Sequence, residues 1–281
     1  MKPLFRQKIA FTVLLLGTIL VIVPVGLILF IIFKEGSSAI NWQFISSMPT
    51  KGMREGGILP AIIGTFYLVI GATLVSLPLG VLAAIYLSEY SKDNLLTRTI
   101  NLAIVNLAGV PSVVYGLFGL SLFVTYFKFG VSILSGALTL AIMNLPVIIS
   151  ASREAFQSVP YSFREVSFSL GASKWQTVRY SVLPFAIPGI LTGAILSLAR
   201  AAGETAPILF TVAAFYLPQL PHSIFDQAMA LPYHLYVIST QIPNIRLDFR
   251  YGTALVLIVI VFSMNIFAVI IRARFRKKKK W

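Results

Sequence analysis

Long stretches without a charged residue alternate with short polar intervals along this chain. Six such charge-free runs cover residues 9–33, 56–88, 99–127, 129–152, 180–199 and 251–271. Each run meets or exceeds the roughly 20 residues that a helix needs to cross the hydrocarbon of a bilayer. The pattern therefore predicts an all-α polytopic membrane protein with six transmembrane helices.

Composition and charge refine this prediction. The chain has 281 residues, of which 57% are hydrophobic and 11% charged, so an ordinary soluble domain is excluded. If both termini are cytoplasmic, the inner segments hold sixteen of the 23 Lys and Arg residues, the outer segments hold six, and Arg200 lies within the membrane. This asymmetry agrees with the positive-inside rule. We therefore expect a multi-pass protein of the cell membrane with both termini in the cytoplasm.

The net charge of +14 belongs mostly to this inner surplus, which includes the basic tail from Arg274. A basic fringe of this kind is typical of contact with anionic membrane lipid, so we expect no nucleic-acid partner. The absence of cysteine excludes disulfides and thiolate chemistry, and nothing indicates a metal site or a cofactor. The two histidines, His222 and His234, fall in the interval 217–250, which is expected to be a proline-rich outer loop, and both are expected to be exposed.

We expect two parts in the chain. Residues 1–54 would form an uncleaved first transmembrane helix and an outer loop, because the first apolar run is long and no A-x-A cleavage site follows it. Residues 55–281 would form the main transmembrane domain. Its second run contains Pro60, Gly64, Gly71 and Pro78, which indicates close helix packing and a tilted or kinked span.

Two runs carry polar residues at membrane depth. The third contains the string GVPSVVYGLF, in which Ser112 and Tyr115 lie beside the helix breaker Pro111. The fifth continues into RAAGETAP, where Arg200 and Glu204 are one helical turn apart and would share a face. Ionised side chains are costly in hydrocarbon and by default face the bundle interior or water. The pattern indicates a translocation pathway for an anion, although a buried ion pair that only fixes helix packing remains an alternative.

A long polar interval between two apolar runs covers residues 153–180. Ser162 and Glu165 have capping-box spacing, as do Ser173 and Gln176, so we predict two short helices separated at Gly171. Apolar residues recur at helical spacing on both: Phe163, Val166 and Leu170 on the first, and Trp175, Val178 and Val182 on the second. The apolar face requires a partner, and headgroups, the chain's own helices and a docked protein all remain possible.

The same interval resembles the EAA loop of ABC importer permeases. Glu165, Gly171, Leu183 and Pro184 stand in the register of the family's pattern EAA, x3, G, x9, I, x, LP, whereas Val166, Ser167 and Ser181 replace Ala, Ala and Ile. The strings GVPSVVYGLF and RAAGETAP resemble the phosphate permeases of this family more specifically. The resemblance covers about residue 55 to the C-terminus.

The resemblance implies a MetI-like permease fold and an importer for inorganic phosphate. In the family the loop couples the permease to a cytoplasmic ATPase, which implicates Ser162, Glu165, Gly171, Trp175, Leu183 and Pro184. The implied partners are a homologous second permease subunit, two ATPase subunits and an external phosphate-binding protein. Arg200 and Glu204 would contribute to anion passage, together with Ser112 and Tyr115.

Three alternatives remain open from the sequence. The cargo of the same kind of importer could be sulfate, molybdate or another oxyanion. A self-sufficient secondary transporter could use Arg200 and Glu204 in a proton relay. A membrane-embedded enzyme is disfavoured by the lack of cysteine and the scarcity of histidine. Because no GxxxxGK[ST] pattern occurs, we expect no catalytic residue in this chain and ATP hydrolysis by another subunit.

Overall fold

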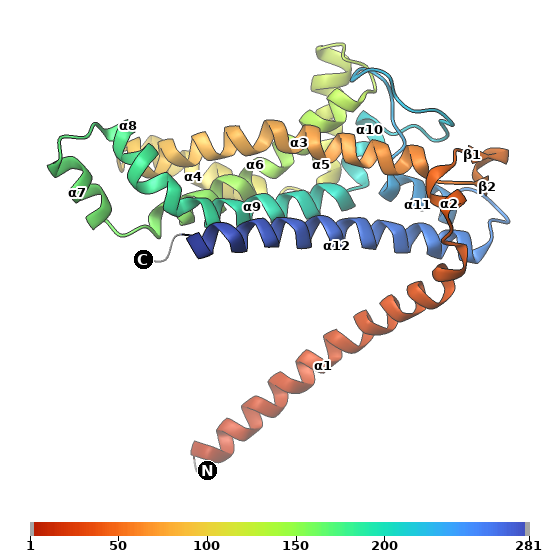
Figure 1. Cartoon of the computed structure of the whole chain (residues 1–281), viewed down its shortest axis with the longest axis horizontal. Helices are drawn as coiled ribbons and strands as arrows, with labels where there is room; N and C mark the ends of the chain where they lie inside the picture. Colours follow the sequence, from red (N-terminus) through yellow and green to blue (C-terminus); the bar gives the residue numbers. More distant parts are fainter. Residues whose placement is uncertain (1–2, 279–281) are drawn as a thin grey trace.

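The computed structural model describes residues 3–278, and most of them are helical (Figure 1). Lys279 and Lys280 of the basic tail lie outside the described residues. The elements of the first half are α1 (Pro3–Gly36), η1 (Ser37–Ala39), α2 (Trp42–Ser46), β1 (Pro49–Thr50), η2 (Lys51–Met53), β2 (Glu55–Gly56), α3 (Leu59–Ile85), η3 (Tyr86–Tyr90), α4 (Leu95–Ala108), α5 (Ser112–Gly119) and η4 (Leu120–Tyr126). Those of the second half are α6 (Ile133–Gln157), α7 (Ser162–Ser169), α8 (Lys174–Gln176), η5 (Thr177–Val182), α9 (Leu183–Gly203), α10 (Ala206–Thr211), α11 (Leu231–Thr240) and α12 (Leu247–Lys278).

Five of the six charge-free runs form helices long and apolar enough to cross a membrane: α1, α3 with η3, α6, α8 to α9, and α12. The third run is different, because its two halves meet at an angle of 103° between α4 and α5. The bend follows Gly109 and falls at Pro111, which caps α5 and cannot continue the preceding helix. Counting this bent pair as one span gives six, so the all-α, multi-span prediction is confirmed.

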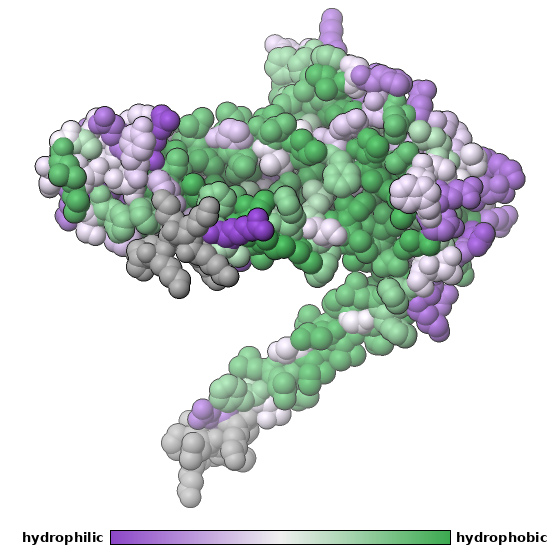
Figure 2. Space-filling model, in the orientation of Figure 1, coloured by the Kyte–Doolittle hydropathy of each residue, from purple (hydrophilic) through white to green (hydrophobic). Residues whose placement is uncertain are grey.

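The bundle has two distinct ends (Figure 1). We call the end that carries α7 and α8 the hairpin end, and the end that carries α2, β1, β2 and α11 the opposite end. Helices α3, α6 and α12 run toward the hairpin end, and α9 returns from it. Helix α1 diverges from the bundle and meets α12 where Gly36 lies against the backbone of Tyr251. Figure 2 shows apolar residues along the bundle and on α1, with hydrophilic residues gathered at both bundle ends.

Small residues allow the central helices to approach closely. A Cβ atom on Gly80 of α3 would lie 2.6 Å from Cγ2 of Ile148 on α6, and one on Gly193 of α9 would lie 2.6 Å from Cβ of Ala151. A Cβ atom on Gly64 would overlap the carbonyl oxygen of Met229. Close packing of small residues is the usual way in which membrane helices associate. Helix α3 continues through Pro78 without a break.

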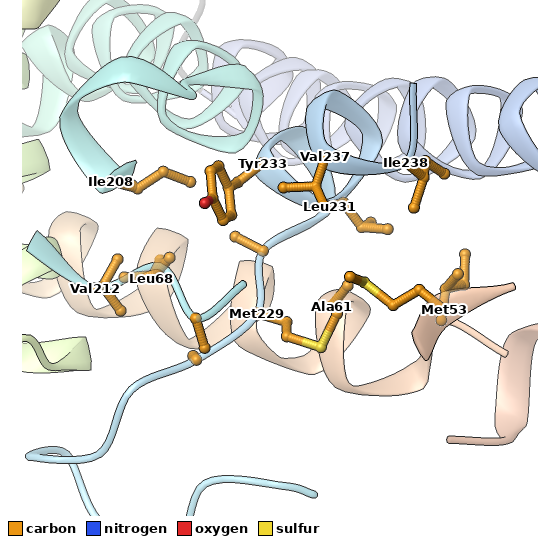
Figure 3. Close-up of a cluster of buried hydrophobic side chains, with 14 of the residues drawn as sticks. Met53, Ala61, Leu68, Ile208, Val212, Met229, Leu231, Tyr233, Val237 and Ile238 are labelled. Atoms are coloured by element: carbon orange, nitrogen blue, oxygen red, sulfur yellow. The ribbon is translucent and has the colours of Figure 1, made fainter. Parts of the chain in front are cut away.

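The largest buried cluster fills the opposite end of the bundle (Figure 3). It joins Leu68 of α3 and Ile208 of α10 to Tyr233 and Val237 of α11. The backbone N–H of Leu231 donates to the hydroxyl of Thr65 at 2.9 Å, which fixes the start of α11 on α3. The interval 217–250, expected to be a loop, therefore contains a helix that belongs to the core.

His234 lies on this helix, and the expectation that it is exposed is wrong. Its side chain is 1% exposed, and neither ring nitrogen has a hydrogen-bond partner among the described residues. Burial lowers the pKa of His234 to about 4, because the charged imidazolium would be desolvated. The imidazole is therefore neutral at physiological pH. His222, in contrast, is exposed as predicted.

The short strands β1 and β2 pair in antiparallel register, with Pro49 opposite Gly56 and Thr50 opposite Glu55. This small hairpin extends across the boundary expected at residue 54. Phe44 of α2 contacts Phe249 of α12 edge to face, with ring centroids 5.0 Å apart. The segment between α1 and α3 is therefore packed on the main bundle.

Candidate functional site

The break between α9 and α10 holds the predicted ion pair of Arg200 and Glu204. Nε of Arg200 lies 3.2 Å from Oε1 of Glu204, and the two side chains are 32% and 16% exposed. The helix ends at Gly203, because Glu204 adopts an extended backbone with φ −73° and ψ 134°. The prediction that both residues share a helical face is therefore wrong in detail. The pair forms because the Glu204 side chain reaches back by one turn.

The packing of α9 explains why Arg200 faces away from the core. The next two residues, Ala201 and Ala202, are buried against Val69 of α3, with Val261 and Met264 of α12 beside them. Gly203 is exposed, and no atom would meet a Cβ placed on it. The last turn of α9 is thus anchored on one side, and the guanidinium of Arg200 lies on the more open side. A partly solvated arginine is suited to transient contact with an oxyanion.

The string GVPSVVYGLF is brought against the string RAAGETAP. A Cβ atom on Gly116 of α5 would lie 3.0 Å from Cα of Pro207 and 3.1 Å from the carbonyl oxygen of Ala206. Tyr115 is buried within electrostatic reach of Arg200. Its hydroxyl donates to the carbonyl of Leu107 at 2.8 Å and thereby bridges the bend between α4 and α5.

Ser112 is half-buried in the first turn of α5. Within residues 3–278, no hydrogen bond joins it to Arg200 or Glu204. The structure therefore brings Tyr115 near the ion pair and shows no contact of Ser112 with it among the described residues. The phenol of Tyr115 supports the bend and can still accept a hydrogen bond, because its donor function alone is occupied.

The polar interval forms the expected helical hairpin, α7 and α8, at the hairpin end. Helix α7 starts at Ser162, but its N-cap is Tyr161 and no side chain caps it. The predicted capping box of Ser162 and Glu165 is wrong, because Tyr161 already has helical backbone angles and Ser162 lies inside the first turn. Glu165 is exposed. Its carboxylate is therefore accessible to another chain.

The turn and the second helix follow the prediction. Gly171 has φ +80°, a left-handed conformation that favours glycine after a helix. Ser173 and Gln176 form a complete capping box at the start of α8. A buried contact of 2.9 Å between the hydroxyls of Ser167 and Thr177 closes the hairpin. Ser167 replaces the family's small alanine, and its hydroxyl finds a partner inside the hairpin.

The apolar stripe of the hairpin is only partly covered by the chain itself. Val178 and Val182 are buried, and the ring of Phe163 contacts Phe185 with centroids 4.7 Å apart. Val166 and Leu170 are 62% and 83% exposed, and Trp175 is also exposed. A cavity of about 440 Å³ lies beside them, lined by Phe163, Val166, Leu170, Tyr180, Ser181 and Phe185, among others. The hairpin thus presents an uncovered apolar surface with a cavity beside it.

The hairpin continues directly into the fifth span. Helix α9 begins at Leu183, with Pro184 in its first turn, as predicted. The preceding residues form the π-helical segment η5, so the helical path from Lys174 to Gly203 is continuous. Proline suits this position because the first amides of a helix have no intrahelical acceptor. A displacement of the hairpin therefore acts on the helix that holds Arg200.

Sequence reasoning missed a buried ion pair at the hairpin end. Nη2 of Arg164 lies 2.5 Å from Oε1 of Glu89, and the two side chains are 11% and 8% exposed. Arg164 was visible in the sequence only as one of several inner-face cations. Glu89 follows the second charge-free run, 75 residues away, so no local pattern joins the two.

These features define a helical, multi-pass membrane protein with an ion pair at the end of one candidate span and a polar hairpin between two spans. The family described as binding-protein-dependent transport system inner membrane component matches residues 76–281. The chain belongs to this family of transport permeases.

Individual relatives extend the similarity beyond the matched region. The chain is 37% identical over 265 residues to the probable ABC transporter permease protein YqgI of Bacillus subtilis, covering 89% of this chain and 90% of that protein. It is 33% identical to the phosphate transport system permease protein PstA 1 of Mycobacterium tuberculosis, covering 95% and 88%. A solved bacterial ABC transporter for alginate import has the same fold, with a TM-score of 0.71, 13% identity and coverage of 97% and 98%.

Proposed function

We propose that this chain is a permease subunit of an ATP-driven ABC importer for inorganic phosphate. The main support is the ion pair of Arg200 and Glu204 at the break between α9 and α10, in a chain that belongs to a binding-protein-dependent permease family. Several relatives named as phosphate permeases are 33–38% identical to it. The chain is thus a transport subunit and not an enzyme.

Arg200 acts as a waypoint for the anion in this proposal. The guanidinium offers a planar fork of donors to an oxyanion, and Glu204 partly neutralises it. A paired arginine binds phosphate weakly, which suits a site that must release its cargo. Tyr115 and Ser112 would line the same pathway, where the phenol also bridges the bend between α4 and α5.

The hairpin is the coupling loop of the transporter. Its exposed Leu170 and Trp175 would enter a groove on an ATPase subunit, and the Glu165 carboxylate would meet a donor there. Both termini and the hairpin would then face the cytoplasm. A homologous second permease would complete the pathway, two ATPase subunits would drive it, and an external phosphate-binding protein would deliver the anion to the opposite end.

Labelled phosphate uptake tests this proposal. Cells that lack the chain are complemented with the wild type, and uptake at low external phosphate is measured with excess sulfate or molybdate as competitor. Wild type should restore uptake, and neither competitor should reduce it. If sulfate or molybdate competes fully, the cargo is another oxyanion, and if nothing is restored, the phosphate assignment is wrong.

A further inference from the structure

All three guanidinium nitrogens of Arg164, in the hairpin, have hydrogen-bond acceptors. Nε lies 3.1 Å from Oε2 of Glu89 and Nη2 lies 2.5 Å from Oε1, a bidentate pair. Nη1 and Nη2 also donate to the carbonyls of Val159 and Phe156, each at 3.0 Å. Glu89 belongs to η3, the π-helical end of α3, whereas Arg164 belongs to α7. The pair therefore ties the hairpin to a different transmembrane helix from the two that it connects.

The second helix of the hairpin, α8, contacts the same turn at the end of α3. The ammonium of Lys174, at the start of α8, lies 5.0 Å from the centroid of the Tyr90 ring. Glu89 and Tyr90 are neighbours in η3, so both helices of the hairpin contact the end of α3. A cavity of about 540 Å³ between η3 and the hairpin is lined by Glu89, Arg164 and Lys174, among others. Next to it, Ala84 and Ile85 of α3 pack in a buried cluster with Val178 and Val182.

Helix α3 leads from this turn to the ion pair of Arg200 and Glu204. It is packed tightly on α6 at Gly80, and Val69, further along, is buried against Ala201 and Ala202. These two alanines directly follow Arg200. Packed helices transmit displacements because protein interiors are dense and barely compressible. A movement of η3 would thus reach the neighbourhood of Arg200 through α3, in parallel with the direct path through α9.

The burial of the pair argues against a role in stability alone. Removing two charges from water costs about as much as their attraction returns, so a buried ion pair is weak support for stability. A bidentate pair does fix one relative orientation of the two groups. The exposed pair of Arg98 and Asp93, also bidentate and near the same bundle end, lies within one short segment and joins no separate elements.

We propose that Glu89 and Arg164 lock the end of α3 to the hairpin, so that α3 moves with the hairpin and carries its displacement to the region of Arg200. Both are positioning residues. The inference rests on the proposed function, because it assigns a second mechanical output to the coupling loop.

The ratio of phosphate transported to ATP hydrolysed measures this coupling. The complete transporter, reconstituted in proteoliposomes with its ATPases and binding protein, is compared as wild type, Glu89→Gln and the control Asp93→Asn. Glu89→Gln should keep the ATPases bound and ATP hydrolysis active, but lower the phosphate moved per ATP by about fivefold, the lower end of typical coupling between distant sites. Asp93→Asn should match the wild type. An unchanged ratio in Glu89→Gln would overturn the inference.

A distance measurement covers the case in which Glu89→Gln assembles poorly. The chain has no cysteine, so Tyr86→Cys in η3 and Ser169→Cys in α7 accept a pair of spin labels without background. In the assembled complex of this double-cysteine variant, with Glu89 and Arg164 unchanged, the distance between the labels should stay the same with and without trapped ATP, because the two elements move together. A distance that changes between the two states would contradict the lock, whatever the behaviour of Glu89→Gln.

Different results would contradict the proposed function and the lock between Glu89 and Arg164. If the wild-type transporter moves no phosphate, the proposed function is wrong. If it transports phosphate normally, and Glu89→Gln does so with the wild-type ratio, only the lock is wrong.

Discussion

At the scale of single residues, Arg200 combines a charge in the last turn of a candidate span with partial exposure. Replacing it with Ala leaves Glu204 without its partner and removes the fork of donors, so phosphate uptake should fall by about 10- to 100-fold, the range expected for charged hydrogen bonds. Arg200→Lys keeps the charge without the fork and should lose less, about tenfold. Uptake is measured at matched membrane levels of the subunit.

Arg272 provides a control for this experiment. It also lies on a spanning helix, and its guanidinium donates to the hydroxyl of Thr192 at 3.1 Å. Arg272→Ala should leave uptake near the wild-type level. If Arg200→Ala transports phosphate normally in an assembled complex, the ion pair only fixes helix packing and Arg200 is not a waypoint for the anion.

His234 makes the stability of the chain depend on pH. Its pKa falls from 6.5 in the unfolded chain to about 4 in the folded one, so the unfolded state binds more protons between these values. The folded state should therefore keep its full stability above pH 6.5 and lose about 3 kcal/mol as the pH falls to 4. Thermal unfolding in detergent across this range measures the loss.

Replacing His234 isolates this contribution. His234→Leu removes two buried nitrogens that lack partners, so it should raise the free energy of unfolding by about 1–3 kcal/mol at neutral pH and flatten the pH profile. His222→Leu changes an exposed histidine and should do neither. A profile that stays equally steep in His234→Leu would show that other groups cause the acid sensitivity.

At the scale of elements, the hairpin exposes an apolar surface that docking would cover. Leu170→Asp places a charge on that surface and should lower the affinity for the ATPase subunit by about 100-fold, as expected for a central interface residue. Leu95→Asp is a matched control, because Leu95 on α4 is 82% exposed and Leu170 is 83% exposed. Co-purification of the ATPase with each variant measures the difference. Equal retention by both variants would place the docking surface elsewhere.

The elements also show how far the sequence could predict the structure. The length of the charge-free runs predicted the spanning helices, because each charged residue placed in lipid is costly whatever its neighbours are. It could not distinguish a straight span from the bend of α4 and α5, although Pro111 marked the place. The cap of α7 was misplaced because Pro160 and Tyr161 start the turn one residue early, with the amide of Phe163 donating to the carbonyl of Pro160.

The parts of the candidate site that lie within one short segment of the chain could be predicted from the sequence. The string RAAGETAP indicated the ion pair, and Gly171 with Ser173 indicated the hairpin turn. The contact of Gly116 with Pro207 and the pair of Glu89 and Arg164 depend on how distant segments pack, and no spacing in the sequence encodes them. His234 was misjudged because α11 carries no charge and is too short to stand out from a proline-rich loop.

At the scale of the whole molecule, the energy source separates an ABC permease from a secondary transporter. A proton relay needs a carboxylate that can take and release protons within the membrane. Glu204 is the one carboxylate in the RAAGETAP segment, and its Oε1 already lies 3.2 Å from Nε of Arg200. The hairpin, in contrast, offers a surface through which a separate ATPase subunit would act on α9.

We therefore expect uptake to follow ATP and not the proton gradient. In proteoliposomes that hold the complete transporter, phosphate uptake should require ATP on the hairpin side and persist when a protonophore dissipates the pH gradient. The same permease reconstituted without its ATPases should move no phosphate under an imposed gradient. Proton-driven uptake by the permease alone would overturn both the coupling role of the hairpin and the waypoint role of Arg200.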